Sequence, residues 1–181
     1  MPVYTTDPCR RNIEPTVDQR LAYEAELHSL VNGHPHAVTF HGAGFDTDTT
    51  ITQSPRPLYF LDLYEGGTLV ELLDQPYLWK RDDRAQSVLL HIVDAVAHCH
   101  VKGVAHRDIK AENVLLSGSD FQTAVLADFG LAHGGLRATK HGIGSQQYIA
   151  PEVIGEHGHA YNPREAMSGR SVYSARRPLA M

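Results

Sequence analysis

The chain has 181 residues, of which 42% are hydrophobic and 20% are charged, and its formal net charge is −5. This length is enough for one domain with a substantial core and too short for two large ones. The mild negative charge argues against sequence-independent nucleic-acid binding, which needs clustered lysine and arginine. Because the sequence also lacks a run of about eighteen apolar residues, the length of a transmembrane helix, we expect neither a nucleic acid nor a membrane as partner.

The cysteine and histidine content does not indicate a disulfide framework or a metal site. Of the two cysteines, Cys9 and Cys99, the second lies within an apolar helical pattern. The first residues lack the apolar core of a secretory signal, so we expect an intracellular protein, cytoplasmic or nuclear, in a reducing compartment. The twelve histidines include three H-x-H pairs, but no carboxylate or thiol completes a metal-ligand cluster beside them.

The first predicted elements are a helix and two strands. They follow a polar segment, residues 1–16, which we expect to be disordered. Apolar residues recur on one helical face from about residue 17 to residue 31, and Asn32-Gly33 supplies a stop signal. Short apolar strands are then predicted within AVTFHGAGF and LYFLDLY, and a pair of glycines ends the second.

The next elements include the strongest helix of the chain. Thr68 and Glu71 form a T-x-x-E capping box at the start of a short helix. From about residue 84 to residue 102, apolar residues recur at three- and four-residue steps, and Gly103 ends this long helix. Two buried strands, VLLS and AVLAD, follow it, and a loop rich in glycine, lysine and histidine leads to APEVIGE.

Polar residues gather beside these two last strands. HRDIKAEN precedes the first of them, and DFG begins at the end of the second. Phosphoryl transfer needs a carboxylate that accepts the hydroxyl proton, a cation near the phosphate and oxygen ligands for magnesium. Asp108 and Lys110 offer the carboxylate and the cation, and Asn113 and Asp128 offer the oxygens. The pattern therefore predicts a phosphotransfer site.

Three motifs resemble those of eukaryotic protein kinases: HRDIKAEN at residues 106–113, DFG at 128–130 and APE at 150–152. Their order and spacing make the combination much more specific than any one motif. The lysine at position 110 is similar to the serine/threonine form, and EAELHSLVNGHPHAV resembles a fungal branch of these kinases. The resemblance implies an α+β protein kinase fold, with a mostly helical C-lobe, helix C and two strands of the N-lobe, over a partial kinase domain at residues 17–155. It also implies ATP and Mg²⁺ as cofactors and transfer of the ATP γ-phosphoryl group to serine or threonine hydroxyls of a protein substrate.

The resemblance implies a role for each motif residue. Asp108 is the catalytic base, and Lys110, in the form typical of serine/threonine kinases, lies beside it. Asn113 completes the catalytic set and, with Asp128, holds the magnesium. Ser145 stands where the family has a threonine that contacts Asp108 and Lys110.

The resemblance also implies which residues contact the nucleotide. LYFLDLYEGG is similar to the hinge between the two kinase lobes. Leu61 is then the gatekeeper, and the Asp62 carbonyl and the Tyr64 N–H are the backbone groups that meet adenine. Leu115 packs under the adenine ring.

The glutamate of helix C has two candidates, Glu24 and Glu26. We choose Glu24, because Leu27 and Val31 share its helix face and point that face inward. The alternative that Glu24 is a solvated helix residue stays open.

The loop before APE suggests a phosphorylation site. His141 stands at the position that usually accepts the phosphate, so Thr139 is the candidate, and a phosphate there would pair with Arg107. A solvated threonine without a regulatory role is an equally good interpretation.

The sequence departs from a full kinase domain at both ends. The family has a glycine-rich strand pair and a strand lysine before helix C, whereas no lysine precedes Glu24. After YNPREA the family continues to DVWS, whose aspartate anchors the catalytic-loop backbone, whereas this chain ends MSGRSVYSARRPLAM. We therefore expect a domain truncated at both ends, with an irregular tail over residues 156–181.

We interpret the residues after Ala166 as a shifted reading frame of an ordinary kinase helix. If one base is removed from codons for Ala-Asp-Val-Trp-Ser-Val, the translation becomes Ala-Met-Ser-Gly-Arg-Ser, which is the sequence of residues 166–171. Two alternatives to an active enzyme follow from these departures. The chain is a catalytically impaired, pseudokinase-like binding module, or it is a gene-model fragment whose long helix lacks the later helices that would cover its apolar face.

Overall fold

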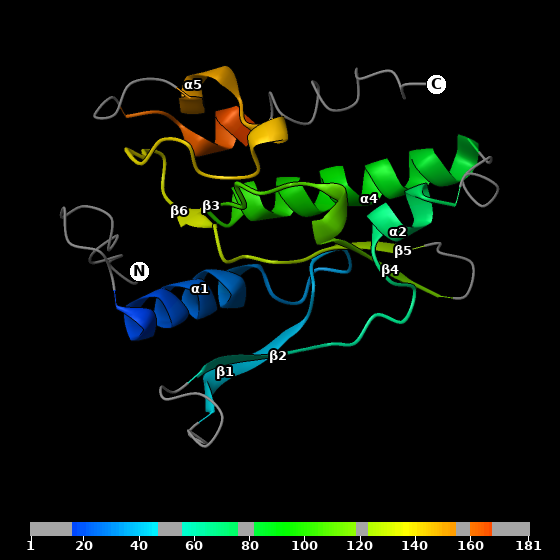
Figure 1. Ribbon diagram of the computed structural model, residues 1–181, viewed down its shortest axis with the longest axis horizontal. Helices are drawn as coiled ribbons and strands as arrows, with labels where there is room; N and C mark the ends of the chain where they lie inside the picture. Colours follow the sequence, from blue (N-terminus) through cyan, green and yellow to red (C-terminus); the bar gives the residue numbers. More distant parts are fainter. Residues whose placement is uncertain (1–15, 47–55, 76–81, 119–122, 155–159, 168–181) are drawn as a thin grey trace.

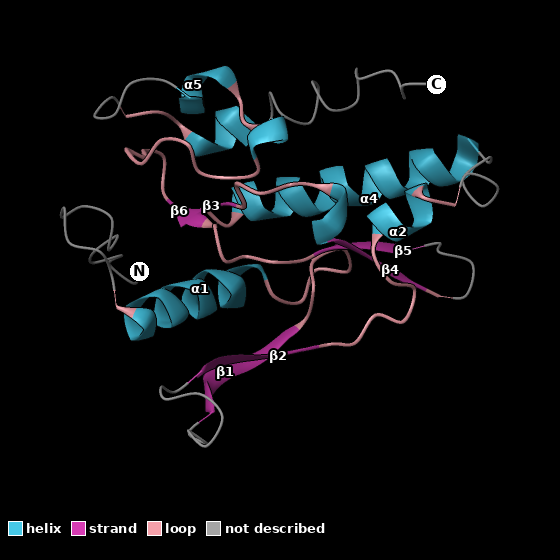
Figure 2. Ribbon diagram, viewed as in Figure 1, coloured by secondary structure: helices cyan, strands magenta, loops and turns pink. Residues whose placement is uncertain are grey.

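The computed structural model describes residues 16–46, 56–75, 82–118, 123–154 and 160–167 of the chain, which has a mixed α+β architecture (Figures 1 and 2). The expected disorder of residues 1–16 falls almost wholly outside this part, as does Cys9. The elements in chain order are α1 (Val17–Val31), β1 (Phe40–Asp46), β2 (Arg56–Leu61), α2 (Leu69–Leu73), α4 (Asp82–Val101), β3 (Val104–Ala105), η2 (Ala111–Asn113), β4 (Val114–Ser117), β5 (Thr123–Leu126), β6 (His133–Gly134), η3 (Gln146–Tyr148) and α5 (Pro151–Ile154).

Helix α1 has the bounds that the sequence predicts. Thr16 caps its first turn, with Gln19 completing a capping box that the sequence analysis missed. At its other end, the Asn32 side chain donates to the Phe40 carbonyl at 2.8 Å and accepts from the Phe40 N–H at 3.1 Å. This reciprocal pair fixes the start of β1 against the end of α1.

The strands within the described ranges form three antiparallel pairs, β1 with β2, β3 with β6 and β4 with β5. The segment that follows α1 adds a short parallel contact to β5. The Val38 N–H donates to the Leu126 carbonyl at 2.9 Å, and the Leu126 N–H donates to the His36 carbonyl at 2.8 Å. Helix α1 is therefore attached through its C-terminal loop to the strand that leads to Asp128.

The largest core cluster joins elements that are distant in the sequence. It is formed by buried apolar side chains of α1, the segment after it, α4, β3, β5 and the turn after β5: Leu27, Val31, Val38, Cys99, Val104, Val125, Ala127, Phe129 and Ala132. Figure 1 shows α4 lying between α1 with its strand hairpin on one side and α5 on the other. Burial of the Cys99 thiol in this cluster raises its pKa to about 12.

Helix α4 covers the core with only one of its faces. Val88, Val96 and Cys99 of the predicted apolar stripe are buried, whereas Leu89 and Val93 are each 50% exposed. The periodicity correctly predicts the helix, but the part of the chain that the structure describes covers only half of the stripe. None of the helices in that part is long and apolar enough to cross a lipid bilayer.

The two glycines after β2 attach this connection to β4. The Gly66 N–H donates to the Leu116 carbonyl at 3.0 Å, and the Leu116 N–H donates to the Gly67 carbonyl at 2.9 Å. A Cβ atom at Gly66 would lie 2.5 Å from the Leu116 carbonyl oxygen, so only glycine allows this close approach.

We predict that Gly66→Ala destabilises the protein by about 1–3 kcal/mol, because the new methyl group must push β4 away. Urea denaturation monitored by circular dichroism measures the change. The matched control is Gly44→Ala on β1, where a Cβ atom meets nothing within 4 Å; its effect should stay within about 0.5 kcal/mol. Equal stability of the two variants would contradict the packing described.

Candidate active site

The carboxylate of Asp108 is the centre of a hydrogen-bond network in the loop between β3 and β4. Its side chain is buried, and the Lys110 Nζ lies 2.9 Å from its Oδ2. Its Oδ1 accepts from the Ser145 N–H at 3.0 Å and from the Ser145 hydroxyl at 2.9 Å. Asn113 donates through Nδ2 to the Asp108 carbonyl at 2.9 Å and to Oδ2 at 3.1 Å. The expected contact of Ser145 with Asp108 and Lys110 is confirmed.

This network keeps Asp108 ionised. Burial alone opposes the charged form, but the hydrogen bonds from Lys110 and Ser145 outweigh burial, so the pKa of Asp108 lies below its ordinary value of 3.8. The hydrogen bond between Lys110 and Asp108 also raises the pKa of Lys110. At neutral pH the site therefore holds a carboxylate that can accept a proton, next to a fixed ammonium group.

His106 connects this loop to the end of β5 as a neutral ring. Its Nε2 lies 2.9 Å from the Ala127 carbonyl and therefore donates, so its Nδ1 is left to accept the Asp108 N–H at 3.3 Å. Complete burial lowers the pKa of His106 to about 4. The ring also lies edge-on to Phe129, with 4.8 Å between the ring centroids.

Two residues of the site adopt a left-handed backbone conformation that is uncommon outside glycine. Arg107 has φ 68° and Asp128 has φ 63°. The Arg107 Nε donates to the Leu131 carbonyl at 2.6 Å, and its backbone N–H donates to the Met167 Sδ at 3.4 Å. Such conformations persist where the surrounding contacts fix them, as they do here.

Asp128 lies next to the loop that carries Asp108. The Ala127 N–H donates to the Asn113 carbonyl at 2.9 Å, which places the two predicted magnesium ligands on adjoining backbone segments. The Asp128 side chain is exposed, and its Oδ1 accepts the Gly130 N–H at 3.2 Å. The hydrogen bond to Asp108 raises the pKa of Lys110, and the negative charges of Asp108, Glu112 and Asp128 add to this increase.

Glu24 of α1 lies near the DFG turn, since a Cβ atom at Gly130 would lie 3.6 Å from its Oε2, whereas Glu26 is exposed. Its Oε2 accepts the Tyr59 hydroxyl at 2.6 Å. Burial raises the pKa of Glu24, the Tyr59 hydrogen bond opposes the increase, and the charge of Asp128 adds to it. No pattern in the sequence indicates Tyr59, because only the register of β2 against β1 turns this side chain toward α1.

The residues predicted to contact adenine lie where the connection after β2 begins. β2 ends at Leu61, which is 40% exposed, so the Asp62 carbonyl and the Tyr64 N–H lie beyond its strand pairing. Tyr64 and Leu115 pack against the same core cluster. The Asp62 carboxylate lies 2.6 Å from the Nε2 of His41. The structure thus packs Tyr64 and Leu115 against one core cluster, and their nucleotide contacts stay predictions.

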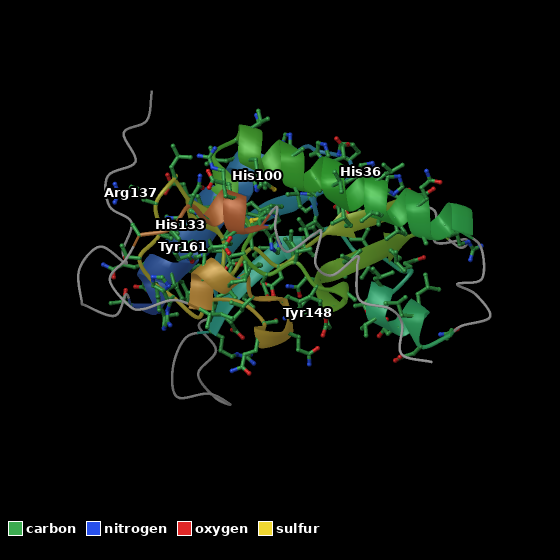
Figure 3. All side chains as sticks on the ribbon, turned by 90° about the horizontal axis from the view of Figure 1, so that it is seen from above. His36, His100, His133, Arg137, Tyr148 and Tyr161 are labelled. Carbon is green, nitrogen blue, oxygen red and sulfur yellow. The ribbon has the colours of Figure 1, made fainter. Side chains whose placement is uncertain are left out.

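Two positions in the segment before α5 were considered for phosphorylation, and their side chains differ in exposure. Thr139 is exposed, whereas His141 is buried, with its ring centroid 5.3 Å from that of Tyr161. Ala138 pairs with Tyr161, and Figure 3 shows Tyr161 near His133 and Arg137. His133 hydrogen-bonds the Arg137 carbonyl at 3.0 Å, which ties down the start of this segment. Phosphorylation of Thr139 stays a prediction.

The comparisons with known proteins agree with this geometry. The chain matches the family described as "Protein kinase domain" over residues 9–167. It therefore belongs to the protein kinase family, and the family predicted from its motifs is confirmed.

Three relatives illustrate the similarity. The chain is 30% identical over 146 residues to the negative regulator of sexual conjugation and meiosis of Schizosaccharomyces pombe (strain 972 / ATCC 24843), covering 80% of this chain and 29% of that protein. It is 31% identical over 141 residues to the serine/threonine-protein kinase chk1 of the same yeast, covering 75% and 26%. It is 35% identical over 141 residues to the delta subunit of calcium/calmodulin-dependent protein kinase type II of Oryctolagus cuniculus, covering 75% and 25%. The chain thus spans less than a third of the length of these relatives.

We predict that Tyr59→Phe raises the pKa of Glu24 further and destabilises the protein by about 1–2 kcal/mol, because a half-buried carboxylate loses its donor. Carboxyl ¹³C NMR titration and urea denaturation measure the two effects. Tyr148→Phe is the control, since its hydroxyl has no hydrogen bond among the described residues; it should change neither quantity. An unchanged Glu24 pKa in Tyr59→Phe would refute the role of this hydrogen bond.

Proposed function

We propose that the chain is a serine/threonine protein kinase domain that transfers the γ-phosphoryl group of ATP to serine or threonine hydroxyls of a protein substrate. One observation carries the proposal: an ionised, buried Asp108, paired with Lys110, lies in a loop whose Asn113 carbonyl is hydrogen-bonded to the residue before a second acid, Asp128. Phosphoryl transfer depends mainly on positioning and charge, and this arrangement supplies both.

In this proposal Asp108 accepts the proton of the substrate hydroxyl. Lys110 lies between Asp108 and Ser145, where its ammonium group can also approach the transferred phosphate. The donor set fits Mg²⁺, since the Asp128 carboxylate and the Asn113 amide provide hard oxygen ligands on adjoining backbone segments. When bound, the metal neutralises charge on the phosphates.

The proposed nucleotide contacts come mainly from the segment that resembles the kinase hinge. The Asp62 carbonyl and the Tyr64 N–H meet the adenine edge, Leu61 lines the back of the site, and Leu115 packs beneath the ring. These assignments are supported by the end of β2 at Leu61 and by the common core contacts of Tyr64 and Leu115.

The same proposal assigns the parts of the chain. Residues 17–155 form a partial kinase domain in which α1 is helix C, β1 and β2 belong to the N-lobe, and the remainder belongs to the C-lobe. We place this domain inside the cell, where ATP and protein substrates are available.

A pseudokinase-like binding module is the second candidate function. Glu24, which in a full kinase pairs with a strand lysine, here accepts a hydrogen bond from Tyr59, and no lysine precedes it in the sequence. Among the described residues, Glu24 is paired with the Tyr59 hydroxyl and not with a cation; fewer charges then position the phosphates, which favours binding with little turnover. A gene-model fragment is the third possibility, and the exposed apolar residues of α4 favour it.

For the tail after Ala166 we propose a shifted reading frame. The resemblance places at residue 167 an aspartate that anchors the catalytic-loop backbone. Met167 is buried, and its sulfur accepts the Arg107 N–H, so a weak acceptor occupies this position. We predict that the encoding DNA, translated in the alternative frame from this codon, reads Asp-Val-Trp-Ser. Absence of that sequence refutes the frameshift and leaves the kinase assignment unaffected.

The decisive experiment combines a thermal shift in Mg-ATP with a transfer assay on serine, threonine and tyrosine peptides. The kinase proposal predicts a shift that Asp128→Ala abolishes, and phosphorylation of serine and threonine peptides that falls at least about 100-fold in Asp108→Asn. Asp74→Ala, an exposed acid at the end of α2, is the control and should change neither result.

Two other outcomes distinguish the alternatives. A nucleotide-dependent shift without phosphate transfer contradicts the enzyme and supports the binding module. A folded protein that shows no nucleotide-dependent thermal shift contradicts both the enzyme and the binding module. A protein without a cooperative melting transition supports the gene-model fragment.

A further inference from the structure

Four histidine side chains meet between the loop after α1 and helix α4, away from the candidate active site. His34 and His98 stack with 4.4 Å between ring centroids and 25° between ring planes, and His36 and His91 stack at 4.0 Å and 15°. The two pairs touch, because His34 and His36 lie edge to face at 5.8 Å. We call these four residues the histidine cluster. Figure 3 shows His36 beside α4.

The backbone of Ala124 in β5 determines the proton positions of one pair. The Nδ1 of His36 lies 3.1 Å from the Ala124 carbonyl, so it must carry a proton and donate. The Ala124 N–H points at the Nδ1 of His91, 3.3 Å away, so that nitrogen must be unprotonated and accept. One ring of this pair is therefore a donor and the other an acceptor to the same residue.

The second pair repeats this arrangement. The Nδ1 of His34 accepts the His36 N–H at 3.2 Å, and its Nε2 lies 3.4 Å from the Asp94 carboxylate. His98 donates through Nε2 to the Val31 carbonyl at 3.2 Å, at the end of α1. In each stack, an acceptor ring (His34 or His91) thus lies against a donor ring.

Protonation of either acceptor ring would break a backbone hydrogen bond and place a cation on a neighbouring imidazole. The ionisable groups that act on His34 are His98, Asp94 and His36, and those that act on His91 are His36 and Asp94. Asp94 favours the charged form, but its carboxylate is 62% exposed, which weakens its effect through solvent screening. Burial, followed by the neighbouring imidazoles, lowers the pKa of both acceptor rings below the ordinary 6.5.

We propose that the histidine cluster is a pH-sensitive latch, which in its neutral form holds the segment after α1 against α4 and β5 and which opens when His34 or His91 takes up a proton. The latch acts on the parallel contact of residues 36–38 with Leu126. Because α1 carries Glu24 and β5 leads to Asp128, opening the latch loosens the connection between these two acidic residues. The effect follows from the backbone attachments and does not require the proposed kinase activity.

The direction of the pH dependence follows from proton linkage. A histidine whose pKa is lower in the folded state binds fewer protons there than in the unfolded chain. The latch is therefore fully closed above pH 6.5, and its contribution is lost as the pH falls below 6.5 toward the lowered pKa values of His34 and His91. Histidine is suited to such a role because its charge changes in this range.

The test uses the full chain and two measurements between pH 5.0 and 7.5. NMR titration of the imidazole Cε1–Hε1 groups follows each histidine, and hydrogen exchange, corrected for intrinsic pH dependence, follows the amides of Val38, Ala124 and Leu126. We expect His34 and His91 to titrate below the ordinary value and the protection of these amides to fall at least about tenfold as they do. Ordinary titration of both rings, or pH-independent protection, overturns the proposal in the unmodified protein.

A double variant, His34→Asn with His91→Asn, separates the latch from other histidines. An asparagine side-chain oxygen reaches the position of Nδ1 and can accept the same N–H, but it takes up no proton at these pH values. The variant should keep its amide protection at low pH, whereas the control His41→Asn, at an exposed position paired with Asp62, should behave like the unmodified protein. If the double variant is folded and loses protection with the same pH profile as the unmodified chain, the proposal is wrong; if it does not fold, the titration of the unmodified chain decides.

Discussion

The buried carboxylate of Asp108 is the constraint on which the candidate site depends. Lys110 and Asn113 come from its own loop, but Ser145 lies 37 residues further along the chain, so this one side chain joins two segments that no strand pairing connects. His106 extends the network to the end of β5. A buried charge is tolerated only when its partners are in place, so these contacts form together and are lost together. They also keep Asp108 in the form that can accept a proton.

Residues close together in the sequence could be predicted, and contacts between distant segments largely could not. The spacing of Asp108, Lys110 and Asn113 within one loop restricts where these side chains can go, so the motif was sufficient to place them together. The bond between Tyr59 and Glu24 depends on strand register, which no local pattern encodes. Helical periodicity predicted α4 and its apolar stripe, but which stripe residues are covered depends on neighbouring elements.

The same limit applies to the histidines. Their H-x-H spacing was considered only for metal binding, whereas the structure stacks them in pairs from the loop after α1 and from α4. That loop has Glu24 on one side and the attachment to β5 on the other, so it links Glu24 to the strand that leads to Asp128. In the part of the chain that the structure describes, Glu24 pairs with the Tyr59 hydroxyl and not with a cation, which bears on the alternatives for function because binding requires fewer positioned charges than transfer does.

The most direct test of the central claim is the pKa of the Asp108 carboxyl group, measured by ¹³C NMR in the unmodified protein and in Lys110→Met. The network predicts a value below the ordinary 3.8 in the unmodified protein. Without Lys110, fewer hydrogen bonds offset the effect of burial on the charged form of Asp108, so the pKa of Asp108 should rise. An Asp108 pKa at or above its ordinary value, or one that does not respond to the loss of Lys110, would show that this network does not hold the site together.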